Sequence, residues 1–232
     1  MSRRARVVVP GLPHHVTQRG NRKLPTFFTD EDKREYLRIL KDQTLRYGVK
    51  IWAYSLMENH VHFLAIPEST DSLSKAFGQT HWHYTRRINF REDWKGYLWQ
   101  GRFSSYVVDE SHLYAVVRYI ENNPVKAGIV QRAEDYPWSS ARAHLYRIND
   151  PLLSHFYLLD NITAWSEYLR SCESEKEGIM LDSHIRTGRP LGSQEFVLRL
   201  ENLTRRVLRK LKPGPKPLEH SSRNSGDTHL IL

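Results

Sequence analysis

The chain has 232 residues, 39% of them hydrophobic, which suits one domain with a packed core plus an appendage and excludes a large multidomain assembly. Its formal net charge of +9 favours a polyanionic partner such as nucleic acid, although a basic balance is also compatible with a solvated surface. The single cysteine, Cys172, excludes an internal disulfide, and no stretch has transmembrane or signal-peptide character, so we expect a cytoplasmic protein with no membrane partner.

The first 23 residues predict a basic arm around one strand. The arm has no acidic residue, and we expect its six cations to contact a polyanion: Arg3, Arg4, Arg6, Arg19, Arg22 and Lys23. The alternation from His14 to Gln18 predicts the strand. Adjacent strand residues face opposite ways, so at most one of His14 and His15 can join a cluster, and we interpret both as structural.

A helix and a hairpin are predicted next. Thr29 followed by three acidic residues is typical of a helix start, and Gly48 is the expected stop. Residues 49–66 are rich in β-branched and aromatic side chains, which predicts two strands. Met57-Glu58-Asn59 is the expected break between them.

A second helix and a further strand follow. The helix is predicted over residues 73–90, and part of its surface either meets nucleic acid or packs into the core: Trp82, Tyr84, Arg86 and Arg87. Residues 104–108 predict a strand that leads into another helix. The order strand, helix, strand, strand, helix, strand, helix predicts an α+β fold, with helices on one side of an antiparallel sheet.

Two histidines lie in the second strand of the hairpin. Side chains alternate along a strand, so His60 and His62 project from one face and Val61 and Phe63 from the other. Neutral imidazole is a common ligand for divalent ions, and a strand holds the spacing of its ligands. The pattern indicates part of a metal site whose third ligand comes from elsewhere. The alternative is a half-buried strand whose polar face carries two histidines.

An amphipathic helix from about Ser111 to Asn122 carries the other candidate residues. Its apolar stripe consists of Leu113, Val116, Val117 and Ile120. At about 100° per residue, Tyr119 and Asn123 lie together on one flank, roughly 70–110° from the centre of that stripe. A tyrosine there is ordinarily a rim residue, but beside a His-x-His strand it favours a phenolic nucleophile next to a metal.

Four motifs follow one another in the chain: His60-Val61-His62, Trp99 to Phe103, Tyr119 to Gly128, and Tyr136 to Ser140. In this order they resemble the REP-associated tyrosine transposases, which are single-tyrosine members of the HUH (histidine, hydrophobic, histidine) nucleases. The resemblance covers roughly residues 10–145 and is specific in combination.

The resemblance implies a ferredoxin-like sheet and a transposase that cleaves and transfers single-stranded DNA in transposition and recombination. Tyr119 would attack the scissile phosphate and form a covalent 5′-phosphotyrosine, assisted by Mg²⁺ or Mn²⁺ held by His60, His62 and Asn123. Imidazole is a softer ligand than Mg²⁺ usually prefers, so Mn²⁺ is equally compatible. The implied substrate carries the hairpin of a repeated extragenic palindrome. The tyrosine acts in cis or comes from a partner subunit, so both a monomer and a homodimer remain open.

Beyond Ser140 the sequence motifs and periodicities indicate structure and function less clearly. Residues 164–171 indicate a helix, and residues 188–192 indicate a turn. Apolar residues then repeat at helical spacing from Phe196 to Leu211, and the basic side chains among them either contact DNA or stay in solvent: Arg205, Arg206, Arg209 and Lys210.

We therefore expect three parts: a catalytic domain over residues 1–145, a helical extension over 146–212 and a disordered tail over 213–232. Arg102 and Lys126, which lie within the motifs, complete the predicted DNA contacts. Two other function classes remain open. One is a DNA-binding regulator with the same fold and no chemistry, and the other is a metal phosphodiesterase that uses water as its nucleophile.

Overall fold

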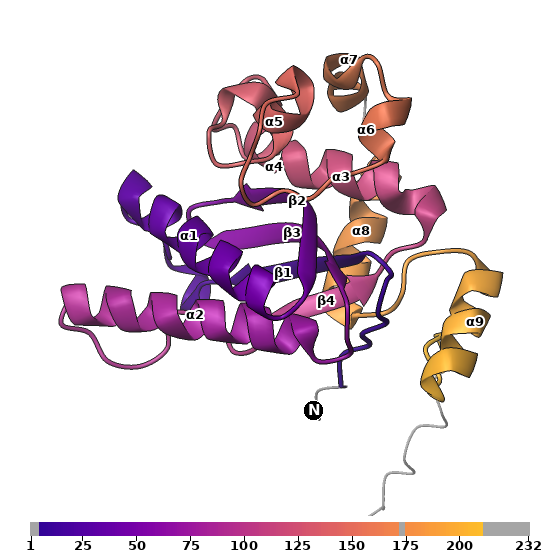
Figure 1. Cartoon of the computed structure of the whole chain (residues 1–232), viewed down its shortest axis with the longest axis horizontal. Helices are drawn as coiled ribbons and strands as arrows, with labels where there is room; N and C mark the ends of the chain where they lie inside the picture. Colours follow the sequence, from indigo (N-terminus) through magenta and orange to yellow (C-terminus); the bar gives the residue numbers. More distant parts are fainter. Residues whose placement is uncertain (1–4, 172–174, 211–232) are drawn as a thin grey trace, which may run out of the picture.

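A four-stranded antiparallel sheet forms the centre of the protein (Figure 1). The computed structural model describes residues 5–171 and 175–210. Arg3, Arg4 and the tail predicted over residues 213–232 lie outside the described residues. The strands are β1 (His14–Arg19), β2 (Val49–Leu56), β3 (His60–Pro67) and β4 (Ser104–Val107), in the order β2-β3-β1-β4. Helix α1 (Asp30–Arg46) connects β1 to β2, and α2 (Ser72–Arg91) connects β3 to β4. This connectivity is ferredoxin-like, which confirms the predicted α+β fold.

The first helix begins and ends where the sequence predicts. The Thr29 hydroxyl accepts a hydrogen bond from the Asp32 backbone N–H, and the Asp32 carboxylate accepts from the Thr29 N–H in return. These two bonds satisfy donors that have no partner in the first turn of a helix. Gly48 follows the helix at φ +61°, a left-handed conformation that glycine adopts without strain. Local chemistry therefore determines both ends of α1.

Helices α1 and α2 cover one face of the sheet. Their apolar side chains pack with Val61 and Phe63 of β3 in one continuous core. Tyr84 is fully buried there and donates a hydrogen bond to the Thr26 carbonyl, whereas Trp82 is half exposed. Of the two alternatives for this surface of α2, packing into the core therefore holds for Tyr84. Trp82 remains at the surface.

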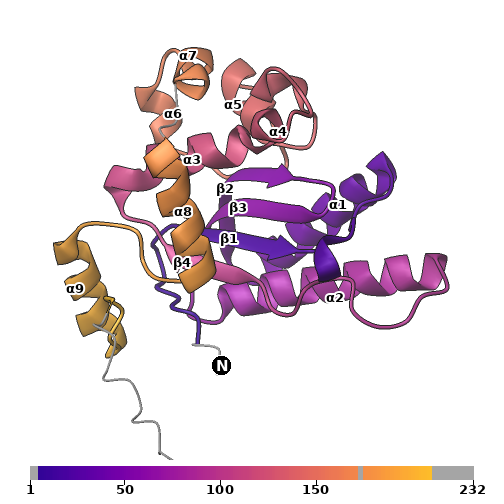
Figure 2. The ribbon, with the colours of Figure 1, turned by 180° about the vertical axis from the view of Figure 1, so that it is seen from behind.

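The opposite face of the sheet is also covered, so the prediction of helices on one side only is wrong. Helix α3 (Leu113–Glu121) and helix α8 (Glu175–Thr187) pack there, and Figure 2 shows α8 beside β4 on this side. The cause is that Leu64 of β3 and Tyr106 of β4 are apolar residues on this face, where they join the core of α3. A second hydrophobic layer is thereby formed from residues distant in sequence.

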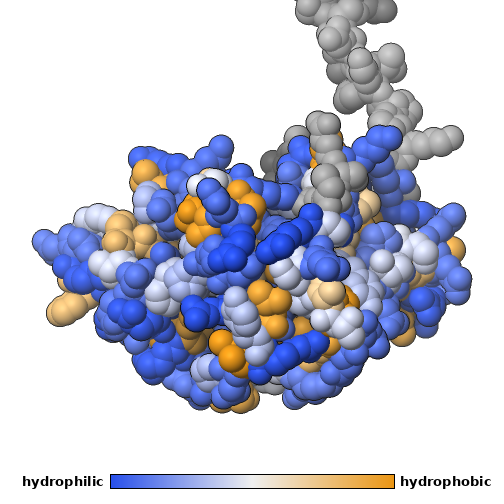
Figure 3. All heavy atoms as spheres, turned by 90° about the horizontal axis from the view of Figure 1, so that it is seen from above, coloured by the Kyte–Doolittle hydropathy of each residue, from blue (hydrophilic) through white to orange (hydrophobic). Residues whose placement is uncertain are grey.

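Short helical segments complete the chain. They are the 3-10 turns η1 (Asn21–Lys23), η2 (Glu110–His112) and η3 (Ala133–Asp135), and the helices α4 (Asn123–Lys126), α5 (Ala141–Tyr146), α6 (Leu158–Asn161), α7 (Trp165–Arg170) and α9 (Gln194–Thr204). The face seen in Figure 3 is mostly hydrophilic with small, separate apolar patches. No helix within residues 5–171 and 175–210 is long and apolar enough to cross a bilayer.

Helix α9 ends earlier than the sequence predicts. It stops at Thr204, and Arg205 adopts φ 54°, the left-handed conformation of a helix cap. The Glu201 carboxylate accepts hydrogen bonds from the backbone N–H groups of Leu208 and Arg209, which turns the chain back. Leu208 then packs into a small core with Val7. The basic residues expected on a helix therefore lie on a folded-back segment instead.

Candidate active site in a basic cleft

The register of the sheet gathers polar side chains on the face covered by α3 and α8. In the antiparallel pair of β1 and β3, Arg19 lies opposite His60 and Thr17 lies opposite His62. Residues directly opposite each other in an antiparallel pair project from the same face. The rings of His60 and His62 lie side by side with their centroids 5.0 Å apart. Strand alternation and register together place both imidazoles on one surface.

His62 is held by His15, which the sequence analysis interpreted as structural. The Nε2 atom of His15 lies 2.9 Å from Nδ1 of His62, and Nδ1 of His15 lies 2.9 Å from the Tyr106 hydroxyl. If His62 Nδ1 donates its proton to His15, and His15 Nδ1 donates to the Tyr106 oxygen, the Nε2 lone pair of His62 remains available as a ligand. This chain of contacts holds the orientation of His62, and with that tautomer it leaves Nε2 as the free donor atom. His14, in contrast, bonds only locally, with the Leu12 carbonyl and the Val9 N–H.

Burial keeps these imidazoles neutral. Desolvation lowers the pKa of His60 to about 4 and that of His15 to about 3. Desolvation, together with the neighbouring histidines and cations, also holds the pKa of His62 well below its ordinary value. All three rings are therefore neutral at pH 7, and neutral imidazole is the form that coordinates a metal ion.

Asn123 reaches the histidines from the start of a separate helix. Helical spacing predicts Tyr119 and Asn123 on one continuous helix, but α3 ends at Glu121 and Asn123 begins α4. Pro124 accounts for the break, because a proline ring inside a helix clashes with the carbonyl four residues earlier. Asn123 is still close enough to His60 to raise its pKa against the effect of burial, while Nδ1 of His60 lies 2.7 Å from the side-chain oxygen of Asn59. Among the described residues no group of three His, Cys, Asp or Glu side chains is arranged to hold a metal ion.

Tyr119 lies between the histidines and the helical extension. Its side chain is only 9% exposed, which differs from the rim position that the helical stripe predicts. Its ring centroid lies 5.5 Å from that of His62, and the Lys126 ammonium lies 4.6 Å from the ring on another side. Its hydroxyl donates a hydrogen bond of 3.0 Å to Asp182 of α8.

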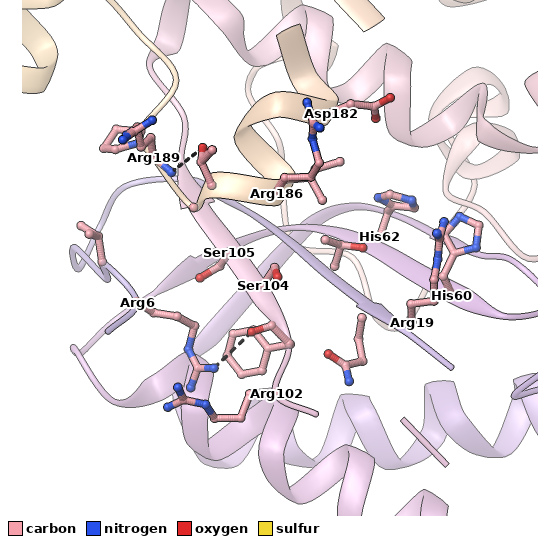
Figure 4. Close-up of a pocket in the computed structure, with 18 of the residues that line it drawn as sticks. Arg6, Arg19, His60, His62, Arg102, Ser104, Ser105, Asp182, Arg186 and Arg189 are labelled. Atoms are coloured by element: carbon pink, nitrogen blue, oxygen red, sulfur yellow. Dashed lines mark hydrogen bonds between the residues drawn. The ribbon is translucent and has the colours of Figure 1, made fainter. Parts of the chain in front are cut away.

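A cleft of about 1180 Å³ opens over these residues (Figure 4). His60, His62, Tyr119, Asn123 and Asp182 all line it. Five of the cations predicted to contact DNA also line it: Arg6, Arg19, Arg102, Lys126 and Arg206.

Two further arginines of the cleft, Arg186 and Arg189, were not predicted, and Figure 4 shows them across the cleft from Arg6 and Arg102. The cleft lining within the described residues thus carries seven cations and one carboxylate, that of Asp182. Such a surface attracts a polyanion. The other described cations predicted to contact DNA are not among the lining residues: Arg22, Lys23, Arg86, Arg87, Arg205, Arg209 and Lys210.

The residues that the sequence analysis missed share one property. Asp182 is separated from Tyr119 by 63 residues, and no local motif relates the two. The alternation of β1 could have placed His15 on a face of the sheet, but only the pairing of β1 with β3 identifies that face as the one that carries His62. Long-range packing, rather than spacing, brings these groups together.

Comparison with known proteins gives consistent matches. The family model described as "Transposase IS200 like" matches residues 10–123, a range that includes both histidines, the tyrosine and Asn123. A curated relative from Haemophilus influenzae, named as a candidate REP-associated tyrosine transposase, is 27% identical over 117 residues. That alignment covers 46% of this chain and 66% of the relative, so the chain spans just under two thirds of the relative's length.

The solved structure of a REP-associated tyrosine transposase bound to a REP hairpin has a TM-score of 0.54 and 22% identity, covering 67% of this chain and 93% of that chain. This similarity shows a shared fold. Over residues 10–123, just under half of the chain, the sequence is therefore similar to the IS200-like transposases.

Proposed function

We propose that this protein is a transposase that cleaves and rejoins single-stranded DNA beside a hairpin, with Tyr119 as its nucleophile. The observation that carries the proposal is the convergence in one cleft of a tyrosine, a pair of neutral histidines with an asparagine, and a set of cations. A phenol supplies the attacking oxygen, neutral imidazoles can bind a metal, and cations bind a DNA backbone. The solved relative bound to a REP hairpin suggests a palindromic hairpin as the substrate.

The metal-binding part of the proposal rests on the donor set. His60 and His62 are neutral and face one surface, and the contact between His15 and Nδ1 of His62 leaves Nε2 of His62 as the remaining donor. These donors fit a divalent ion. Mg²⁺ or Mn²⁺ held by His60, His62 and Asn123 would polarise the scissile phosphate.

The chain's own residues would then act on the DNA as follows. Tyr119 Oη forms a bond to phosphorus while the bond from phosphorus to the 3′-oxygen breaks. The product is a 5′-phosphotyrosine and a free 3′-hydroxyl, which can attack in the reverse direction to rejoin DNA. The Lys126 ammonium, 4.6 Å from the Tyr119 ring centroid, favours the negative charge that develops on the phenol oxygen.

The cations of the cleft position the DNA. We propose that Arg6, Arg19 and Arg102 contact the backbone from the catalytic domain, and that Arg186, Arg189 and Arg206 contact it from the extension predicted over residues 146–212. Contacts to phosphates supply affinity that is largely independent of base sequence. The extension would thus form one wall of the substrate cleft.

The test is incubation of the protein with end-labelled, hairpin-bearing single-stranded DNA and Mn²⁺, followed by denaturing gels. The wild type should yield a covalent protein–DNA product, and Tyr119→Phe should yield none. Tyr114→Phe is the matched control, because Tyr114 lies on the same helix but 38% exposed and is absent from the cleft lining. Cleavage by Tyr119→Phe would favour water as the nucleophile, and an uncleaved substrate with the wild type would favour a regulator.

A further inference from the structure

Asp182 places a negative charge in the cleft that we propose to bind DNA. It is the one carboxylate among the described lining residues, which otherwise include seven cations. A negative charge there repels DNA phosphates and so weakens binding. The same carboxylate accepts the hydrogen bond of the Tyr119 hydroxyl at 3.0 Å. Its position is thus unfavourable for binding but adjacent to the atom that would react.

The surrounding structure fixes this carboxylate in place. Arg118, the neighbour of Tyr119 on α3, forms an ion pair of 2.7 Å with Glu177 of α8. Leu181, next to Asp182, is fully buried in the core that α3 shares. Beyond α8, Leu191 donates its backbone N–H to the Val107 carbonyl and so ties the chain to β4. A group held on a helix by contacts on both sides is well placed for chemistry.

Proton removal is the step that the other cleft residues leave unassigned. A phenol has an ordinary pKa of about 10, so at pH 7 its proton must leave as the oxygen attacks. Lys126 is a cation that favours the phenolate, but an ammonium is not a base at neutral pH. The two histidines facing Tyr119 have other contacts, since His62 and His15 bond to each other. Asp182 has both a lone pair and direct contact with the hydroxyl.

We propose, resting on the function proposed above, that Asp182 is the general base for Tyr119. The Tyr119 Oη proton moves to Asp182 Oδ1 as Oη bonds to phosphorus. The bond from phosphorus to the 3′-oxygen breaks with its electron pair on that oxygen, which takes a proton from water. In rejoining, the 3′-hydroxyl loses its proton to water as its oxygen bonds to phosphorus, and Asp182 gives its proton to the departing phenol oxygen. The extension is on this account part of the catalytic machinery.

A test of this proposal must separate a general-base role of Asp182 from a purely structural role. Tyr106 of β4 interacts with its charge, Tyr119 of α3 donates a hydrogen bond to it, and Arg186 lies on its own helix within the cleft. Asp182→Asn keeps an oxygen that accepts the Tyr119 hydrogen bond but removes the base. A purely structural role for Asp182 would therefore be preserved in this variant.

The experiment measures single-turnover formation of the covalent adduct between pH 6 and 10, and DNA affinity in parallel. Asp182→Asn should bind the hairpin DNA at least as tightly as the wild type yet form adduct about 100-fold more slowly, within the usual range for general-base catalysis. Its rate should rise about tenfold per pH unit where the wild-type rate is level, because ionisation of the phenol then replaces the base. Asp182→Glu should recover part of the rate.

Glu177→Gln is the control on the same helix, because it removes the ion pair to Arg118 and keeps the Asp182 carboxylate that accepts the Tyr119 hydrogen bond. It should keep the wild-type pH profile. An Asp182→Asn rate within threefold of the wild type, or above it, with an unchanged profile would overturn the inference while leaving the adduct and the proposed function intact. Absence of an adduct from the wild type would remove the proposed function and this inference with it.

Discussion

The contact between His15 and His62 predicts that His15 controls metal affinity without binding the metal. Replacing His15 with Ala removes the hydrogen bonds to His62 Nδ1 and to the Tyr106 hydroxyl, both 2.9 Å long and buried. His62 can then rotate or adopt the other tautomer. Removal of such an outer contact typically lowers metal affinity or activity by about 10–100-fold. The concentration of Mn²⁺ for half-maximal adduct formation should rise by that factor, equivalent to about 1.4–2.7 kcal/mol.

His14→Ala provides a matched control. His14 is the adjacent residue of the same strand, is equally buried and also bonds through both ring nitrogens, but to the Leu12 carbonyl and the Val9 N–H. Either variant leaves buried polar partners unsatisfied, at about 1–3 kcal/mol for each group, so both should lose stability. Only His15→Ala should alter the Mn²⁺ requirement.

The assay is a Mn²⁺ titration of adduct formation with the wild type and both variants, at a temperature where urea denaturation shows all three folded. Equal half-saturation for His15→Ala and the wild type would refute the role of the His15 contact. If His14→Ala raised the half-saturating Mn²⁺ concentration by the same factor, the cause would be lost stability rather than the His15 contact.

Three further predictions concern stability and binding. His14 and His81 are buried with pKa values lowered by desolvation to about 4 and about 3, so the unfolded chain binds more protons below pH 6.5. The free energy of unfolding should therefore fall by about 1.6 kcal/mol per histidine between pH 6.5 and pH 5, and equal urea midpoints at the two values would contradict this. Arg102→Ala should make the log–log salt dependence of DNA binding shallower by about 0.7, whereas Arg86→Ala, outside the cleft lining, should not change it in a filter-binding assay. Thr29→Ala should lower the free energy of unfolding by about 1 kcal/mol through loss of the α1 cap, and an unchanged denaturation midpoint would argue against that cap.

Local patterns in the sequence predict the central sheet well. The start of α1 at Thr29, its end at Gly48 and the break at residues 57–59 each depend on neighbouring residues. The shared face of His60 and His62 follows from strand geometry alone. The wider fold follows from the order of these elements, because few topologies connect them without crossing.

The remaining features depend on contacts between distant segments. The end of α9 is set by Glu201, which accepts hydrogen bonds from a later turn, so the apolar repeat alone predicts too long a helix. The position of Tyr119 is a second case, since a stripe on one helix cannot show that α8 covers its flank. Asp182 and His15 were missed for the same reason: their partners lie on other elements of the fold.

Peptide mapping of the trapped adduct tests the central claim most directly. Wild-type protein is incubated with hairpin-bearing single-stranded DNA and Mn²⁺, digested with protease and nuclease, and the modified peptide is sequenced by mass spectrometry. The account predicts a nucleotide on Tyr119 alone. Modification of Tyr114, which is 38% exposed on the same helix, would contradict the assignment of the nucleophile, and active cleavage without any modified tyrosine would contradict the mechanism.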